Sequence, residues 1–193
     1  ATLHGATSID GFCVREAVFP ISAEAKLASR LGPVMQSTGE VIGSASSYGM
    51  AYYKAQEAAG DRLPISGSVL ITVTDADKPS IIEPARRFRE MGFRILTTRG
   101  TAAFLESNGI ATDTVRKLGM GRPDLVDAVK TRQVDLIINT PSGQQGQTDD
   151  GYIRKAAIRY RIPYISTPAG ALAAAKGIAA QRHAALRLRP AGQ

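Results

Sequence analysis

One short run, Thr98-Arg99-Gly100-Thr101, combines two hydroxyls, a cation and a glycine. Residues 93–97 before it are typical of a strand, and residues 102–107 after it are typical of a short helix. The start of a helix offers free backbone N–H groups and the positive end of the helix dipole, and Gly100 lets the backbone approach a ligand closely or turn with a positive φ. The run therefore predicts a cradle for an anion such as phosphate.

Similar polar residues follow the other strands that the sequence predicts. Because the carboxyl ends of parallel strands meet at one edge of a sheet, we expect these side chains to converge. Lysine charge, hydroxyl donors and backbone N–H groups suit a phosphate, although each residue type alone is also common in turns and helix caps. The residues expected at this site are Lys78, Thr98, Gly100, Thr101, Lys117, Asn139, Ser142 and Gly143.

The same stretch offers little for catalysis. Residues 68–177 contain no histidine and no cysteine, and their closest acidic pairs, Asp75 with Asp77 and Asp149 with Asp150, are typical of loops and helix starts. No HExxH, GxSxG or Walker motif occurs. The residue types therefore predict binding rather than turnover, with no catalytic residue and no metal site.

The order of the elements predicts the fold. From residue 68 onward, apolar runs alternate with helical patterns, which is typical of an α/β fold with a doubly wound, mostly parallel five-stranded sheet and helices on both faces. Residues 1–66 lack this alternation, apart from one predicted helix at 48–59, and residues 60–67 are typical of a linker. The expected strands are 68–73, 93–97, 112–115, 135–139 and 163–166, and the expected helices are 79–91, 102–107, 125–131, 150–160 and 170–180.

Composition limits the class of protein. The chain has 193 residues, 44% of them hydrophobic, which is enough for one domain, alone or with a fragment of another. No segment approaches the roughly 20 apolar residues of a membrane span, and the single cysteine favours a reducing compartment, so we expect a cytoplasmic protein. The chain begins without methionine, and we interpret it as a piece of a longer protein.

The net charge of +7 allows an anionic partner without identifying one. Part of this charge lies in the tail, residues 181–193, which we expect to be a solvated, frayed end. Tryptophan is absent and no aromatic-basic RNA motif occurs, so we expect neither a nucleic acid nor a membrane as a partner.

Several motifs together resemble the carbamoyl phosphate synthetase large chain. "LGPVMQSTGEVIG" and "AYYKAQEAAG" are similar to the end of its second synthetase half, an ATP-grasp unit. "TTRGTAAFLESNGI", "GRPDLVDAVK", "LIINTPSG" and "YIRKAAIRYRIPYIST" are similar to its C-terminal regulatory domain. The resemblance implies a synthetase fragment with its linker at 1–66, a methylglyoxal-synthase-like regulatory domain at 67–180, and a basic tail at 181–193.

The resemblance also implies a ligand. The family's regulatory domain binds a nucleotide effector, UMP or IMP. Some members carry a hydroxyl where this chain has Pro141, so either Ser142 and Gly143 compensate or the effector differs. Ornithine, a second effector, implies a contact at Ser166, but Ile165 stands where some members have an aspartate, which argues against ornithine control. By resemblance, the phosphate contacts are Lys78, Thr98, Thr101, Lys117 and Asn139.

Three functions stay open at this point. The resemblance implies an effector-binding domain that is not an enzyme by itself and holds no cofactor, within a ligase that makes carbamoyl phosphate from bicarbonate, glutamine-derived ammonia and ATP for pyrimidine and arginine synthesis. That parent enzyme uses ATP with Mg or Mn, the remaining synthetase halves and a glutaminase small subunit, and its oligomeric state is open. The alternatives are a free-standing methylglyoxal-synthase-type lyase, which needs a carboxylate base and a histidine, and a basic nucleic-acid-binding module.

Overall fold

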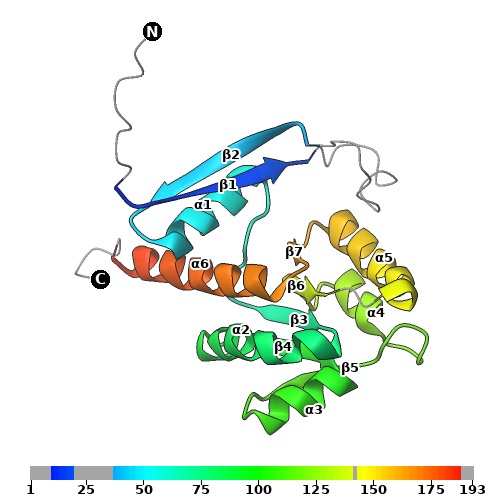
Figure 1. Ribbon diagram of the computed structural model, residues 1–193. Coiled ribbons are helices and arrows are strands. Elements are labelled where there is room, and N and C mark those ends of the chain that lie inside the picture. Colours follow the sequence, from blue (N-terminus) through cyan, green and yellow to red (C-terminus); the bar gives the residue numbers. More distant parts are fainter. Residues whose placement is uncertain (1–9, 20–36, 141–142, 188–193) are drawn as a thin grey trace.

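The computed structural model describes residues 10–19, 37–140 and 143–187, and it contains the predicted parallel sheet (Figure 1). The five strands lie in the order β5-β4-β3-β6-β7, and every neighbouring pair is parallel. Since the chain winds outward in opposite directions from β3 and from β6, the switch point for a ligand lies at their carboxyl ends. The strands are β3 (Ser68–Thr72), β4 (Arg94–Thr98), β5 (Asp113–Val115), β6 (Leu136–Asn139) and β7 (Tyr164–Ile165).

Helices cover both faces of the sheet, as the alternation predicts. α2 (Lys78–Glu90), α3 (Arg99–Ser107) and α6 (Pro168–Arg187) pack on one face, while α4 (Leu125–Lys130) and α5 (Gly143–Tyr160) pack on the other. Alternation along β6 supplies both cores: Leu136 and Ile138 enter the first core, and Ile137 enters the second. The strands are therefore apolar on both sides, which explains why they stand out in the sequence as continuous runs.

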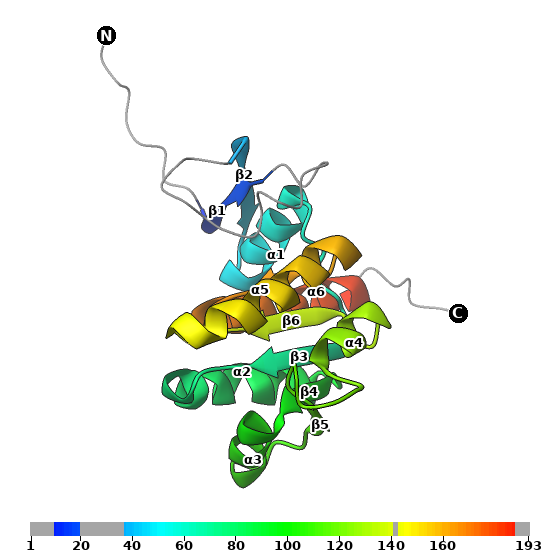
Figure 2. The same cartoon turned by 90° about the vertical axis from the view of Figure 1, so that its right-hand side faces the viewer.

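The N-terminal part of the described chain forms a hairpin and a helix that stack on α6 (Figures 1 and 2). β1 (Phe12–Val18) pairs antiparallel with β2 (Gly39–Ala45), and α1 (Tyr48–Ala59) lies between this hairpin and α6. Two glycines allow close contact: a Cβ on Gly43 would lie 2.2 Å from the Ala51 carbonyl oxygen, and one on Gly49 would lie 2.5 Å from that of Lys176. Sequence patterns do not reveal the hairpin, because no short turn motif joins its two strands.

Two helices begin earlier than the sequence indicates. α3 begins at Arg99 rather than at residue 102, so Thr98 is both the last residue of β4 and the N-cap of α3. α5 begins at Gly143 rather than at residue 150. The polar and small residues that precede each apolar pattern are thus already helical. The predicted phosphate-binding run, Thr98-Arg99-Gly100-Thr101, therefore lies at the N-terminus of α3.

The last helix is longer than expected. α6 continues to Arg187, so the expectation of a frayed end is wrong for residues 181–187. Its alanine-rich sequence favours helix, and the Arg182 side chain donates a hydrogen bond to the Met91 carbonyl at the end of α2. In the described part of the chain, no helix combines the length and the apolar character needed to cross a membrane.

Candidate functional site

Two acids after β3 have different roles. The chain passes through Thr74 into the single 3-10 turn η1 (Asp75–Asp77) and then enters α2. Thr74 fixes this turn, since its hydroxyl donates to the Asp77 carboxylate at 2.9 Å and accepts from the Asp77 backbone N–H at 3.3 Å. The Asp75 side chain is left outside, 94% exposed, with its carboxylate 2.7 Å from the Lys78 ammonium. The turn thus places Lys78 at the carboxyl edge of the sheet.

Lys78 reaches across to the first turn of α3. Its side chain is 18% exposed, and its ammonium lies 5.9 Å from the centre of the Phe104 ring. A Cβ placed on Gly100 would lie 3.9 Å from the same ammonium. Gly100 is not among the positive-φ residues, so the alternative that it makes a left-handed turn is wrong. Because Gly100 has no side chain, the backbone of α3 is not covered on the side that faces Lys78.

Thr98 and Thr101 lie at the start of α3 and are both buried, with exposed fractions of 5% and 2%. Thr98 is the N-cap but makes no side-chain capping bond, and Thr101 is the third residue of the helix, so Thr101 is not a cap. The first turn carries Arg99 and no acidic residue. Two buried threonines and the free N–H groups of the helix start thus lie next to Gly100, which faces the Lys78 ammonium, and these groups suit an anion.

Lys117 supplies a second positive charge that acts on Asp75. It lies in the exposed loop after β5. The pKa of the Asp75 carboxyl is lowered, first by its hydrogen bond to Lys78 and by the charge of that lysine, and further by the charge of Lys117. Both lysines thus act on one exposed carboxylate beside the N-terminus of α3.

Asn139, at the end of β6, has a fully occupied carboxamide. The Thr72 hydroxyl donates to its oxygen at 2.5 Å, and its amide nitrogen donates to Asp150 at 2.7 Å and to the Tyr164 hydroxyl at 2.8 Å. A carboxamide has two N–H donors, so neither is left for a ligand in this arrangement. Asn139 therefore ties β3, β6, α5 and β7 together, and one of these bonds must break before its amide can bind a phosphate.

The network around Asn139 extends to Arg154. The Tyr164 hydroxyl donates to Asp150, and the Arg154 guanidinium lies 3.1 Å from the same carboxylate and 5.3 Å from the centre of the Tyr164 ring. Burial raises the pKa of Tyr164 to about 12, and the Asp150 charge acts in the same direction, so the phenol stays a donor. This network was not predicted from the sequence. The spacing of four between Asp150 and Arg154 is a signal for the ion pair, whereas no pattern marks Tyr164.

Of the remaining predicted residues, Gly143 and Ser166 can be placed. Ser142, like Pro141, lies outside the described residues, and Gly143 begins α5. Ser166 directly follows β7 and is exposed, while Ile165 is 7% exposed and belongs to the first core. Within the described residues, no group of His, Cys, Asp and Glu side chains is arranged to hold a metal ion.

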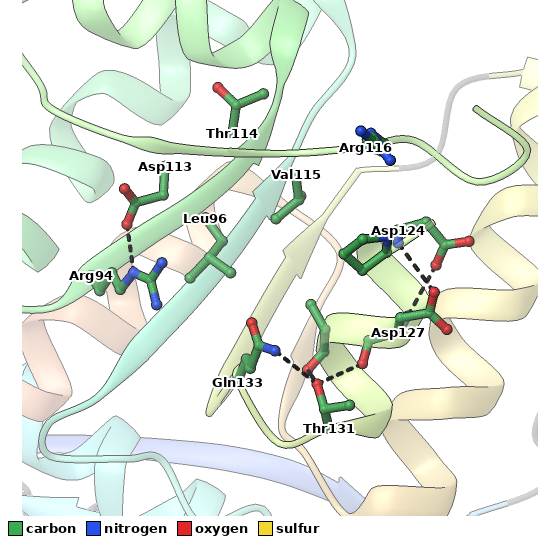
Figure 3. Close-up of a pocket in the computed structure, with 12 residues that line it drawn as sticks. Arg94, Leu96, Asp113, Thr114, Val115, Arg116, Asp124, Asp127, Thr131 and Gln133 are labelled. Carbon is green, nitrogen blue, oxygen red and sulfur yellow. Dashed lines mark hydrogen bonds and ion pairs between the residues drawn. The ribbon is translucent and has the colours of Figure 1, made fainter. Parts of the chain in front are cut away.

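A pocket of about 370 Å³ lies elsewhere, along α4 and the strands β4 and β5 (Figure 3). It is lined in part by Leu96 and Val115, and it includes none of the predicted phosphate contacts. Much of its polar lining is already engaged, because Asp124 caps α4. The other engaged pairs are Arg94 with Asp113, Gln133 with Thr131, and Arg116 with the Arg122 carbonyl. We therefore place the candidate anion site at Lys78 and α3 rather than in this pocket.

A comparison of the sequence with known protein families identifies a domain in the region that forms most of the parallel sheet. The family model described as the MGS-like domain matches residues 80–166, which begin in α2 and end just after β7. The chain contains an MGS-like domain. The matched residues contain the strands β4 to β7 and the helices α3, α4 and α5, and they include Thr98, Thr101, Lys117 and Asn139.

Several relatives of this chain are named as carbamoyl phosphate synthase large chains. The one from Archaeoglobus fulgidus is 49% identical over 168 residues, which cover 86% of this chain and 16% of the relative. The large chain's C-terminal section from Methanopyrus kandleri is 46% identical over 166 residues, covering 86% of this chain and 31% of the relative. The chain thus matches the C-terminal region of these large chains and spans less than a third of either relative.

A solved structure of methylglyoxal synthase from Elizabethkingia anophelis NUHP1 also matches, with a TM-score of 0.44 and 20% identity. The match covers 56% of this chain and 76% of that protein. A similarity this low carries no argument about activity.

Proposed function

We propose that the chain is the nucleotide-effector domain of a carbamoyl phosphate synthase large chain, preceded by the end of its second synthetase half. The observation that carries the proposal is the meeting of Lys78 with the first turn of α3, where a Cβ on Gly100 would lie 3.9 Å from the ammonium. A phosphate dianion is the natural ligand for a lysine and a helix N-terminus that lie together. UMP and IMP are the candidate effectors.

In the proposed complex, the phosphate lies between Lys78 and α3. Thr98 and Thr101 donate hydroxyl hydrogen bonds, the backbone at Gly100 approaches closely, and Lys117 supplies a second positive charge. Asn139 takes part only after it releases Asp150 or Tyr164. Ser142 and Gly143 stay proposed phosphate contacts, and Ser166 stays a proposed ornithine contact.

The proposed parent protein is the cytoplasmic ATP-dependent ligase that forms carbamoyl phosphate with ATP and Mg or Mn, assisted by a glutaminase small subunit. The similarity of the chain to large chains of two organisms supports this parent. By itself, the chain is proposed to bind and not to catalyse. The lyase alternative needs a histidine at the site, and residues 68–177 contain none.

Isothermal titration calorimetry of the chain with UMP, IMP, UTP and uridine tests the proposal. We expect at least one nucleotide to bind and uridine to bind much more weakly, because the phosphate supplies the charge-assisted contacts. Absence of heat with every nucleotide at millimolar concentration would contradict the effector role. Methylglyoxal release from a triose phosphate would instead support the lyase.

A further inference from the structure

We infer that Asp75 is an internal competitor of the effector: its carboxylate occupies the anionic position beside Lys78 that the ligand phosphate takes. The inference rests on the proposed function and adds a regulatory feature to the same site. Its starting point is the 2.7 Å contact between the Asp75 carboxylate and the Lys78 ammonium.

Positive charge is concentrated where this contact lies. The Lys78 ammonium is close to the first turn of α3, and that turn begins with Arg99 and contains no acidic residue. A cation beside a helix N-terminus is unfavourable unless an anion compensates for it. Lys117 adds to the excess, since its charge also lowers the pKa of Asp75. The site therefore attracts an anion, and Asp75 supplies one from within the chain.

Asp75 is free to move because the surrounding turn does not depend on it. Thr74 and Asp77 hold the turn together through two hydrogen bonds. The Asp75 side chain is 94% exposed, and its ion pair is with Lys78 alone among the described residues. The side chain can therefore rotate away from Lys78 without disturbing α2 or β3.

Two consequences follow for a phosphate ligand. It must break the contact between Asp75 and Lys78, and it must bind beside a carboxylate of its own sign of charge. Both effects weaken binding, so the chain without the Asp75 charge should bind more tightly. If Asp75 instead positions Lys78 for the ligand, its removal should weaken binding, so the sign of the change separates the two roles.

The test compares wild type with Asp75→Asn, which keeps the shape of the side chain and removes its charge. Glu90→Gln is the matched control, because it removes one negative charge from an exposed position at the far end of the same helix. Twelve residues of helix separate Glu90 from Lys78 by roughly 18 Å, beyond the Debye length of about 8 Å at physiological salt. Calorimetry with UMP, IMP and uridine gives the affinities, and circular dichroism checks the fold.

We expect Asp75→Asn to bind the nucleotide about two- to fivefold more tightly than wild type, as for the loss of one exposed ion pair, with uridine unchanged and Glu90→Gln equal to wild type. In a Lys78→Ala background the gain in nucleotide affinity from Asp75→Asn should shrink, because the ammonium for which the carboxylate and the phosphate compete is absent. Unchanged or weaker affinity in Asp75→Asn, or an equal gain without Lys78, would overturn the competition while leaving the proposed function intact. Absence of nucleotide binding in every protein, wild type included, would overturn both.

Discussion

The amide nitrogen of Asn139 lies 2.8 Å from the hydroxyl of Tyr164, and this hydrogen bond joins the ends of the neighbouring strands β6 and β7. The same hydroxyl donates to Asp150 on α5. Three elements that meet at the carboxyl edge of the sheet are thus held by one phenol. The bonds are at least partly buried, where an unsatisfied polar group costs more than the bond itself contributes.

Tyr164→Phe should therefore lower the free energy of unfolding by about 1–3 kcal/mol, because Asp150 and Asn139 each lose a partner. Chemical denaturation followed by circular dichroism measures the change. Tyr160→Phe is the control, since Tyr160 packs against the same apolar core but does not belong to the network. Equal losses in the two variants would show that the network contributes nothing specific.

Lys78→Ala and Lys117→Ala should each weaken binding of a nucleoside monophosphate. Loss of a charge-assisted contact costs about 1.5–3 kcal/mol, which corresponds to roughly tenfold or more in affinity. Lys130→Ala provides the control, because Lys130 is exposed at the end of α4. Calorimetric affinities that are the same in all three variants would place the phosphate elsewhere.

Thr101→Val should reduce nucleotide affinity without reducing stability. Valine keeps the shape of the buried threonine and removes its hydroxyl, and Thr101 is the third residue of α3, so no helix cap is lost. Binding of the nucleoside should be unchanged, since the hydroxyl is expected at the phosphate. Combined with Lys78→Ala, the loss should be non-additive because both residues would contact one phosphate. Strict additivity, or an equal loss for nucleoside and nucleotide, would refute the shared contact.

The parallel sheet was predictable because its signals are local. Strands buried on both faces appear as apolar runs, and the five predicted strands agree with the structure to within one residue at each end. The placement of Lys78, Thr98, Gly100 and Thr101 near one another follows from the topology alone, since residues after neighbouring parallel strands share an edge. The helix ends were less predictable, because α3 begins with polar and small residues that are equally common in loops.

Other features depend on contacts between distant residues and leave no local trace. The occupied amide of Asn139 requires Tyr164, which follows it by 25 residues on another strand. The hairpin of β1 and β2 likewise pairs Phe12 with Ala45, far beyond the length of a turn. Neither the contact between Asn139 and Tyr164 nor the pairing of β1 with β2 has a period or a fixed spacing that can be recognised in one sequence.

Glu16→Gln should stabilise the chain at neutral pH. Burial raises the pKa of Glu16 above its ordinary value of 4.5, the Asp61 charge adds to this, and a hydrogen bond from Gln56 opposes it. The folded chain therefore binds a proton more readily than the unfolded chain, and stability falls as the pH rises through the window above 4.5. Glu16→Gln lacks this loss, so its free energy of unfolding should exceed that of wild type at pH 7.5, and the difference should vanish near pH 4. The gain should stay below about 1 kcal/mol, because solvent screens the half-exposed group.

Denaturation curves at several pH values measure this gain, with Glu90→Gln as the exposed control. A gain that is independent of pH would exclude the titration of Glu16 as its cause. A stability loss at neutral pH would show that the hydrogen bond from Gln56, 2.9 Å long, outweighs the burial of the charge.

The last prediction concerns the contact between α1 and α6, which attaches the N-terminal hairpin to the MGS-like domain. Gly49→Ala should lower the free energy of unfolding by about 1–3 kcal/mol, the usual cost of overpacking. A Cβ at this position would lie 2.5 Å from the Lys176 carbonyl oxygen and 2.8 Å from its carbon, and both atoms belong to the backbone of α6, which cannot rotate away. Intrinsic helix propensity predicts the opposite sign, since alanine is favoured over glycine by about 1 kcal/mol inside a helix.

Gly151→Ala separates the two effects. Gly151 lies within α5, and nothing is within 4 Å of the position that its Cβ would take. Only propensity acts there, so this variant should gain up to about 1 kcal/mol in denaturation experiments. Opposite signs for the two substitutions would establish that the backbones of α1 and α6 touch in solution. A gain in both would mean that α1 lies away from α6, and that the hairpin of β1 and β2 is attached to the domain by the connecting chain rather than by packing.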